Sequence, residues 1–245
     1  MKLAIMQPYL FPYLGYFQLI HASDKFVFYD DVNFIKNGWI NRNRLLLDGK
    51  SHYFTVPLSG ASSFESIRQT RFQPDDGRWR RKLLGTFQLA YRRAPFAAAG
   101  LNLVEETFAI RTDSVAELAR HSVKRVLAYL GLERAIVDSS NDYGNAHLKG
   151  QERVIDICTR ERAATYVNAP GGVELYDEAA FASAAIDLRF VRGELPKYPQ
   201  GPHPFVPGLS ILDSIMHCPA HAVAEMAAKY ELAAPESIRR GQALS

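Results

Sequence analysis

The sequence has few of the features that mark a secreted, membrane-bound or disulfide-linked protein. Only two cysteines, Cys158 and Cys218, occur among 245 residues, which excludes a disulfide scaffold and a four-cysteine zinc site and favours a reducing cytoplasm. No uncharged apolar run approaches the ~20 residues of a membrane-spanning helix. The N-terminal segment, MKLAIMQPYLFPYLGYF, does not resemble a signal peptide. We therefore expect a cytoplasmic protein without a membrane span.

Several motifs that identify common enzyme classes are also missing. There is no Gly-x-Gly-x-x-Gly and no Walker P-loop, so a dinucleotide dehydrogenase or a P-loop kinase lacks support. No repeat, zinc finger or RNP-like motif is present, which argues against nucleic acid as a partner. His217 and His221 are four residues apart, but Pro219 interrupts the helix between them and there is no HExxH. We therefore predict no metal site and no nucleic-acid binding.

The residues that are present have an ordinary globular composition but an uneven charge distribution. Hydrophobic residues make up 47% of the chain and charged residues 22%, and the net charge is +3. Segment 34–93 has 12 Lys or Arg and 4 Asp or Glu, a net charge of +8, so the rest of the chain has a net charge of −5. This distribution fits either a solvated basic face or a site for an anionic ligand, such as a phosphate or a sugar nucleotide.

Hydrophobic periodicity predicts alternating strands and helices near both ends of the chain. Strands are expected at 2–6, 25–29, 135–138, 164–167 and 187–191, and helices at 13–22, 151–162, 210–216 and 220–230. Between these two α/β stretches, a hairpin of 44–47 with 52–58 is expected around the Asp48-Gly49-Lys50 turn. Helices follow at 75–93, 94–110 and 112–130, the last one capped by Thr112 or Asp113 and ended by Gly131.

This order of elements predicts a three-layer, Rossmann-like α/β fold with a mostly parallel sheet. Residues 1–74 and 132–245 are expected to form the core that contains the site, and residues 75–131 a helical insertion. Ligands of open α/β sheets bind outside the carboxyl ends of the strands, near helix N-termini. Candidate site residues are therefore sought where strands end.

The first candidate segment follows the first strand. Gln7, Tyr9, Tyr13 and Gly15 lie between that strand and the first helix. Gly15, one turn into the helix, would let a ligand or a neighbouring backbone come close. The tyrosines fit either a ligand site or the rim of the core.

Two adjacent acids follow the second strand. Asp30 and Asp31 point to opposite sides of an extended chain, so they cannot be assumed to act as a pair. Either one fits a ligand for a ribose or sugar hydroxyl, a Mg²⁺ ligand, a general base or a solvated loop acid. His52, on the predicted hairpin, is a candidate acid or base if it faces one of them, and otherwise structural.

A basic segment with one tryptophan precedes the hairpin. Asn41 and Asn43 are expected on one face of an extended strand, and Arg42 and Arg44 on the other. Arginine forks suit carboxylate or phosphate, asparagine binds hydroxyls and amides, and Trp39 offers a stacking face. The alternative is a surface strand with basic side chains.

The second α/β stretch has polar and flexible residues after its strands. Ser139 and Ser140 follow one strand, and Gly171 and Gly172 another. They are expected at the same sheet edge as the first segment, where they fit phosphate or hydroxyl binding as well as ordinary turns. Further along, Ser210 is a good N-cap, and Asp213 is expected to complete a capping box with it.

Together these segments resemble the WbqC-like protein family along nearly the whole chain. The matching stretches are QPYLFPYLGYF, DKFVFYDDVNF, WINRNRL, HYFTVPL, ERVIDICTRERAATYVNAPGG, YPQ and LSILD. After LSILD the sequence reads SIMHCP, where a glycine-containing turn is expected. The family is associated with gene clusters for bacterial O-antigen and other surface polysaccharides, so the resemblance implies a role in making or decorating an activated sugar.

The first turn has a weaker similarity to HIGH-type nucleotidyltransferases and pantothenate-synthetase-like ligases, which have a nucleotide-binding HxGH turn there. Gly15 matches the glycine of that turn, while Tyr13 and Tyr16 stand in place of the histidines. This similarity implies a derived nucleotide-binding fold whose loop serves a different activated donor.

The preferred interpretation is an enzyme that transfers an acyl or aminoacyl group to a nucleotide-linked amino sugar. Arg42 and Arg44 would hold phosphate or carboxylate, and Asp31 or His52 would remove the acceptor's proton. A nucleotide or nucleotide-sugar is the expected ligand, and the sequence leaves a homodimer open. The alternatives are a non-catalytic binding or assembly protein of a glycan pathway and a derived HIGH-type enzyme.

Overall fold

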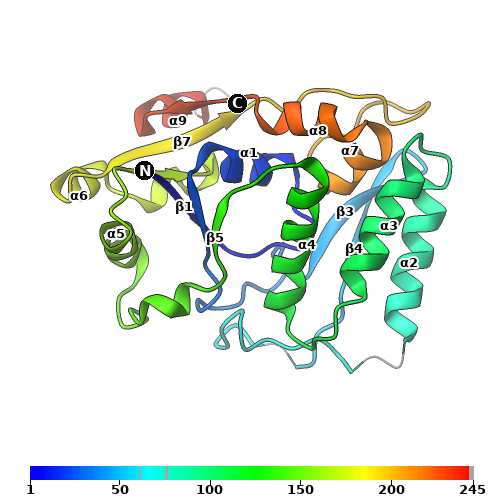
Figure 1. Ribbon diagram of the computed structural model, residues 1–245, viewed down its shortest axis with the longest axis horizontal. Helices are drawn as coiled ribbons and strands as arrows, with labels where there is room; N and C mark the ends of the chain where they lie inside the picture. Colours follow the sequence, from blue (N-terminus) through cyan, green and yellow to red (C-terminus); the bar gives the residue numbers. More distant parts are fainter. Residues whose placement is uncertain (61, 75–76, 243–245) are drawn as a thin grey trace.

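Within the residues that the computed structural model describes, which are 1–60, 62–74 and 77–242, six strands form one sheet. Their order is β5-β2-β1-β6-β7-β8, and only β7 and β8 pair antiparallel. The strands are β1 (Lys2–Met6), β2 (Lys25–Phe28), β5 (Ala135–Val137), β6 (Thr165–Asn168), β7 (Asp187–Gly193) and β8 (Tyr230–Ala233). The predicted Rossmann-like, mostly parallel α/β fold is therefore confirmed (Figure 1).

Helices cover both faces of this sheet, because successive strand residues point to opposite sides. In β1, Ala4 belongs to one hydrophobic cluster, while Leu3 and Ile5 belong to the other. The first cluster includes α1 (Leu14–Ala22), α4 (Val115–Leu130), α7 (Ile211–His217) and α8 (Ala220–Ala227). The second includes α5 (Gly150–Arg160), α6 (Glu178–Ser183) and α9 (Pro235–Gln242). The structure thus has the three layers that the sequence predicts.

The segment between β2 and β5 contains a separate hairpin and three helices. The hairpin pairs β3 (Arg42–Leu47) with β4 (Lys50–Thr55), and its turn residues Asp48 and Gly49 have φ angles of 49° and 71°. α2 (Arg78–Tyr91) and α3 (Ala97–Phe108) lie on the right of Figure 1, beyond α4. This geometry agrees with the expected Asp-Gly turn, in which both central residues need positive φ.

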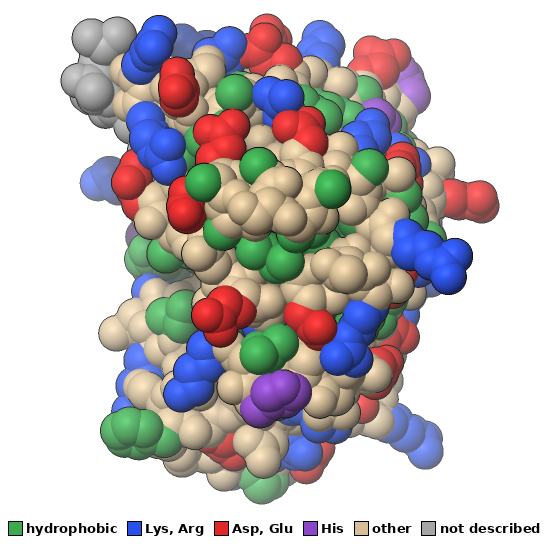
Figure 2. Space-filling model, turned by 90° about the vertical axis from the view of Figure 1, so that its left-hand side faces the viewer, with side chains coloured by type: hydrophobic (Ala, Val, Ile, Leu, Met, Phe, Trp, Pro, Cys, Tyr) green, Lys and Arg blue, Asp and Glu red, His purple; other side chains and the backbone are tan. Residues whose placement is uncertain are grey.

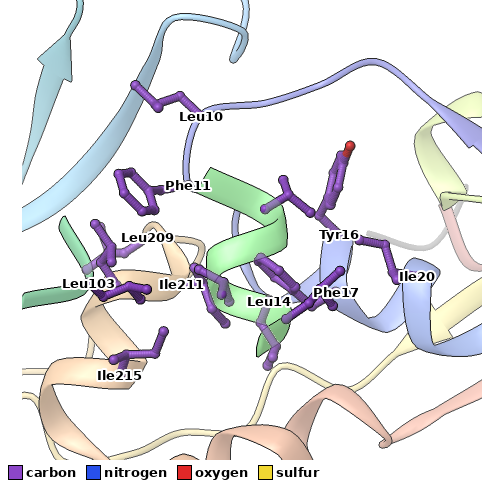
Figure 3. Packing of buried hydrophobic residues seen from close by; sticks show 14 of the residues in the cluster. Leu10, Phe11, Leu14, Tyr16, Phe17, Ile20, Leu103, Leu209, Ile211 and Ile215 are labelled. Carbon is purple, nitrogen blue, oxygen red and sulfur yellow. The ribbon is translucent and has the colours of Figure 1, made fainter. Parts of the chain in front are cut away.

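The segment between β2 and β5 shares its core with the sheet layer. Phe54 of the hairpin packs on Phe87 of α2 with ring centroids 4.8 Å apart. A Cβ at Gly100 of α3 would lie 2.4 Å from the sulfur of Met216 in α7, so a glycine is needed for this close approach. Figure 3 shows Leu103 of α3 beside Phe11 and Ile211 in the same cluster. The proposed division at residues 75–131 stays a prediction.

Two local expectations about the elements are wrong. Ser114, not Thr112 or Asp113, is the N-cap of α4, and its hydroxyl accepts a hydrogen bond from the Glu117 N–H at 3.3 Å. The Thr112 hydroxyl instead accepts from the Ser114 N–H at 3.0 Å. Gly131 ends the helix in the left-handed region with φ 66°, as expected.

The second wrong expectation concerns the end of the chain, where a helix over 220–230 was expected. α8 ends at Ala227, and residues 230–233 form β8 instead. β8 is an edge strand that exists because β7 offers it backbone hydrogen bonds, and such long-range pairing leaves no periodic pattern in four residues. None of the described helices is long and apolar enough to cross a membrane.

Candidate functional site

The strand order creates a switch point between β1 and β6. The chain leaves β1 towards β2 on one side, whereas β6 is followed by β7 on the other side. Connections that diverge in this way leave a crevice outside the carboxyl ends of the two strands. A cavity of about 490 Å³ lies there, lined by Met6 and Gln7 at the end of β1 and by Asn168, Ala169, Gly171 and Gly172 at the end of β6. We call it the switch-point cavity.

The switch-point cavity brings together residues from several of the predicted segments. Of the candidate ligand-binding residues it is lined by Gln7, Tyr9, Tyr13, Gly15, Trp39, Gly171 and Gly172. The loop after β1 reaches the tryptophan segment through a hydrogen bond from the Leu10 N–H to the Trp39 carbonyl oxygen, at 3.1 Å. Tyr16, which the sequence places in the same turn, also lines the cavity. Sequence reasoning missed five further lining residues, Tyr29, Ile35, Asn168, Leu175 and Tyr176.

The walls are aromatic and polar, and none of the described lining residues is charged. The rings of Tyr9 and Tyr16 lie 5.6 Å apart, and the Tyr16 hydroxyl donates to the Gln7 carbonyl oxygen at 2.8 Å. Burial raises the pKa of Tyr9, Tyr13 and Tyr16, so these phenols stay protonated at neutral pH. The Gln7 side-chain amide makes no hydrogen bond with the part of the chain that is described. Neutral donors and acceptors therefore face the cavity.

The space beside Gly15 is filled by the side chain of Tyr13. A Cβ there would lie 2.5 Å from the ring of Tyr13, which covers the first turn of α1. The close approach that this glycine permits is therefore that of the Tyr13 side chain.

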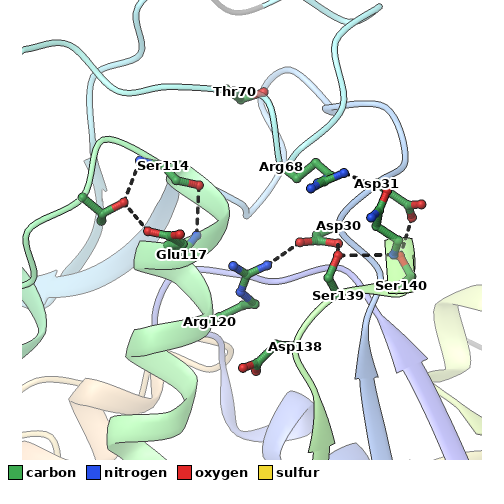
Figure 4. Close-up of polar contacts among 12 residues, drawn as sticks. Asp30, Asp31, Arg68, Thr70, Ser114, Glu117, Arg120, Asp138, Ser139 and Ser140 are labelled. Carbon is green, nitrogen blue, oxygen red and sulfur yellow. Dashed lines mark hydrogen bonds and ion pairs between the residues drawn. The ribbon is translucent and has the colours of Figure 1, made fainter. Parts of the chain in front are cut away.

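Asp30 is buried beyond the end of β2, where side chains of two other segments bind its carboxylate. Its carboxylate forms an ion pair with Arg120 of α4 and accepts a hydrogen bond from the Ser139 hydroxyl at 2.6 Å (Figure 4). Burial raises the pKa of Asp30, while Ser139 and Arg120 oppose that rise. Both carboxylate oxygens have partners, so this geometry describes a structural ion pair, and a catalytic role for Asp30 stays a prediction.

Asp31 is held in a similar way on the other side of the chain. Arg153 of α5 lies 2.5 Å from one of its oxygens, and the Ser140 hydroxyl donates to the other. The Arg153 guanidinium carbon also lies 5.1 Å from the centre of the Tyr29 ring, and Tyr29 lines the switch-point cavity. Asp31 is thus connected to the cavity wall through Arg153 and Tyr29.

Ser139 and Ser140 sit at the same sheet edge as Gln7, because β5 and β1 run parallel to β2. Their hydroxyls donate hydrogen bonds to Asp30 and Asp31. Figure 4 shows both serines turned towards these acids. Their predicted role in ligand binding is not tested by these contacts.

The predicted alternation of asparagine and arginine over residues 41–44 is present, and the two residue types make different contacts. Asn41 and Asn43 are buried. The Asn41 amide donates to the Val56 carbonyl oxygen at 2.8 Å, and that of Asn43 donates to Leu10 and Phe11 at 3.1 and 2.9 Å. The Asn41 bond joins the two ends of the hairpin, and the Asn43 bonds connect the hairpin to the loop after β1.

Arg42 and Arg44 lie on the opposite face, against aromatic rings at the rim of the switch-point cavity. The Arg42 guanidinium carbon is 4.6 Å from the centre of the Tyr53 ring, and Tyr53 stacks on Trp39. The Arg44 guanidinium carbon is 5.4 Å from the Trp39 ring, and its Nη2 donates to the Gly208 carbonyl oxygen at 2.7 Å. Both arginines therefore hold Trp39 in place, and anion binding by them stays a prediction.

His52 stands apart from the acids that it was expected to face. It is exposed on β4, opposite Leu45 of β3, in the two-stranded sheet. None of the described contacts connects it to Asp30 or Asp31. Its role as an acid or base stays a prediction without a partner in this geometry.

Only one half of the capping box expected at the start of α7 is present: Ser210 acts as the N-cap, but the expected return contact from Asp213 is wrong. The Ser210 hydroxyl caps α7 by accepting from the Leu212 N–H at 3.3 Å. The Asp213 carboxylate is fully buried and does not reach back to Ser210. It accepts hydrogen bonds from Tyr91 at 3.0 Å, Tyr198 at 2.8 Å and Gln200 at 2.7 Å. The YPQ and LSILD segments quoted above contain three of these residues, but their spacing alone does not indicate this contact.

Comparison with known proteins identifies a family and one relative in Mycobacterium tuberculosis. A family model described as the WbqC-like protein family matches residues 7–225. An uncharacterized protein of Mycobacterium tuberculosis, Rv1507c, is 30% identical over 224 residues, which is 90% of this chain and 95% of that protein. No solved structure gives a significant match.

Proposed function

The chain belongs to the WbqC-like protein family, and from that premise we propose that it is an enzyme of bacterial surface-polysaccharide synthesis. It binds a nucleotide-linked sugar in the switch-point cavity and modifies the sugar there. The two free thiols, Cys158 and Cys218, are in keeping with a cytoplasmic location for this reaction.

One observation supports this proposal above the others: the largely aromatic cavity lies at the switch point of a Rossmann-like sheet. Such crevices are where open α/β proteins bind nucleotides and related ligands. The volume of about 490 Å³ falls within the range of small-molecule sites. The position and the size therefore agree with a ligand of this class.

The wall chemistry suits the neutral parts of such a ligand. The faces of Trp39 and Tyr9 offer stacking surfaces for a base or a sugar ring. Gln7 and Asn168 add amides, which bind hydroxyls and the edges of bases. We therefore place the sugar or nucleoside, rather than the diphosphate, between these walls.

For the reaction, we propose acyl or aminoacyl transfer to the amino group of the sugar. The amine attacks the carbonyl carbon of an activated donor, the bond to the donor's leaving group breaks, and a base accepts the proton of the amine. Asp31 is our candidate for positioning this centre, because its contact with Arg153 reaches the wall residue Tyr29. His52 stays a candidate base only if a bound substrate reaches the hairpin.

The site is tested by filling the cavity without disturbing the fold. A Cβ at Gly171 would meet nothing within 4 Å, and its φ is not in the left-handed region. Gly171→Leu should therefore fold normally and place a side chain in the cavity. We expect it to weaken binding of UDP-glucose, measured by isothermal titration calorimetry, by about tenfold or more, which is about 1.4 kcal/mol.

The matched control is Gly85→Leu. Gly85 lies in α2, and a Cβ there also meets nothing within 4 Å. This variant should bind UDP-glucose as the unchanged protein does. Equal binding by both variants, or no binding of UDP-glucose by any of the three proteins, would contradict the proposed site.

A second candidate function, docking to a partner of a glycan pathway, is favoured by apolar side chains at the mouth of the cavity. Ile35 is 53% exposed and Leu175 is 69% exposed, although both line the cavity. Docking to an acidic polymer is not favoured on the face drawn in Figure 2, where basic and acidic side chains are interspersed. Turnover of a donor and a nucleotide-linked amino sugar by the purified protein separates the two functions, since a docking protein gives none.

A further inference from the structure

A second cavity, of about 550 Å³, shares no lining residue with the switch-point cavity. It lies between the hairpin turn, the C-terminal end of α2 and the loop after β7 that runs to α7. Its lining residues are 46–49, 89–95, 199–203 and His217. We call it the hairpin cavity. Nothing in the function proposed above uses it.

One side chain of this cavity has a fixed orientation that leaves a polar atom free. The Nδ1 of His217 lies 2.8 Å from the Asp213 carbonyl oxygen. Because a carbonyl oxygen only accepts, Nδ1 must carry a proton. Nε2 is then the ring nitrogen left for a further hydrogen bond, as an acceptor in the neutral ring or as a donor in the imidazolium. Nε2 makes no hydrogen bond with the described residues. The side chain is only 10% exposed, and His217 lines the cavity.

The surroundings of His217 keep the ring in that orientation. The rings of Tyr91 and Tyr198 flank the imidazole, with centroids 5.9 and 6.5 Å away. The Asp213 carboxylate lies 3.8 Å from Nδ1 and is itself held by the hydroxyls of both tyrosines and by Gln200. Burial raises the pKa of Asp213, and the nearby imidazole and the three donors oppose that rise. A buried polar network of this kind pre-organises the side chain above it.

The mouth of the hairpin cavity is basic. Arg92 and Arg93 are exposed, line the cavity, and make no side-chain ion pair or hydrogen bond with the described residues. Asp48 is the one acidic residue among the described lining residues. Guanidinium groups without a protein partner are suited to bind phosphate or carboxylate. The His203 ring of the loop that forms one wall lies close to the hairpin turn, 2.5 Å from the position of a Cβ at Gly49.

We propose that the hairpin cavity is a second ligand site for a small hydroxylated oxyanion, such as a sugar phosphate or a sugar acid. The oxyanion binds Arg92 and Arg93, and a hydroxyl of the ligand, which can donate or accept, forms a hydrogen bond with Nε2 of His217. The apolar wall residues Leu46 and Leu89 cover the carbon skeleton. This proposal does not depend on the function of the switch-point cavity.

The probes for the test are glucose 6-phosphate, glucuronate and glucose. They share a sugar ring and carry a phosphate, a carboxylate and no charged group, respectively. They therefore distinguish binding of a phosphate from binding of a carboxylate or of the neutral sugar. We expect either anion, but not glucose, to shift the imidazole NMR resonances of His217 in the unchanged protein. We expect calorimetry to show binding of the same anions.

The matched variants are His217→Asn and His221→Asn. An asparagine amide at 217 can still donate to the Asp213 carbonyl oxygen but has no group in place of Nε2. We expect His217→Asn to weaken anion binding about tenfold. His221 is exposed on α8, and its variant should bind as the unchanged protein does.

A second pair of variants tests the oxyanion end of the ligand. The double variant Arg92→Ala with Arg93→Ala should weaken anion binding by at least about tenfold. Lys82→Ala, an exposed position of α2, should leave it unchanged. Three outcomes would overturn the proposal: no shift of His217 resonances with either anion at about 10 mM, binding of glucose as tight as that of the anions, or unchanged anion binding in a folded Arg92/Arg93 double variant.

Discussion

At the scale of single residues, the polar side chains around the switch-point cavity divide into two groups. Some hold the backbone in place: Asn41 donates to a carbonyl group at the other end of the hairpin, and Asn43 donates to two carbonyl groups of the loop after β1. Others, such as Gln7, line the cavity with no hydrogen-bond partner in the described structure. Only the second group is available to a ligand without a loss of stability. This distinction decides which variants report on binding and which report on folding.

Asn43→Ala is predicted to destabilise the protein. The substitution removes a buried amide and leaves the Leu10 carbonyl oxygen without that donor. We expect the free energy of unfolding in urea to fall by about 1–3 kcal/mol. Asn102→Ala is the control, because Asn102 is exposed on α3 and bonds only Glu106. An Asn43 variant as stable as the Asn102 variant would show that the buried amide is not needed.

At the scale of elements, single ion pairs join strands to the helices that cover them. Lys25 at the start of β2 lies 2.6 Å from Glu161, which follows α5 as its C-cap residue. The other oxygen of Glu161 accepts a hydrogen bond from the Tyr143 hydroxyl at 2.7 Å. Partial burial tends to raise the pKa of Glu161, but the contacts with Lys25 and Tyr143 outweigh it and the pKa is lowered.

The lowered pKa of Glu161 predicts how this contact depends on pH. A carboxylate with a lowered pKa in the folded state contributes stability above its unfolded pKa of 4.5, and that stability is lost as the pH falls through the folded value. Glu161→Gln should therefore cost about 1 kcal/mol at pH 7, the upper end for a partly exposed pair. The measurement is urea unfolding from pH 7 to pH 3. A difference between the two proteins that grows as the pH falls would have the wrong sign for this explanation.

At the scale of the whole molecule, the segment between β2 and β5 behaves as part of the main core. Residues of α2, α3 and α4 belong to the same hydrophobic cluster as Ala4 of β1 and Phe17 of α1. Elements that share one continuous core cannot unfold separately without exposing the partner's apolar surface.

We therefore predict one cooperative thermal transition for the full chain. Differential scanning calorimetry should give a calorimetric enthalpy equal to the van't Hoff enthalpy, which is a test for two-state unfolding. Two resolved transitions would support an independently folding insertion at residues 75–131 and contradict the shared core. Far-UV circular dichroism and tyrosine fluorescence should give the same midpoint.

Most of the fold could be predicted from the sequence because the patterns that indicate its strands and turns lie within short segments of the chain. The apolar runs that form β1, β2 and β6 are continuous in the chain, and the Asp48-Gly49 turn has the positive φ angles that its residues favour. Strands of one sheet that run parallel end at the same edge, which is why Gln7 and Gly171 could be expected together. β8 could not be predicted, because its four residues form a strand only where β7 is available.

The sequence by itself determined where the parallel strands of the sheet lie in the chain and at which edge of the sheet the chain presents its polar turns. Only the tertiary structure decided what those polar groups contact. The arginines that bind Asp30 and Asp31 come from 90 and 122 residues away, and Asp213 accepts from Tyr91 across 122 residues. Secondary structure depends on neighbours along the chain, whereas the partner of a buried charge depends on which distant helix packs against it, and no local pattern encodes that choice.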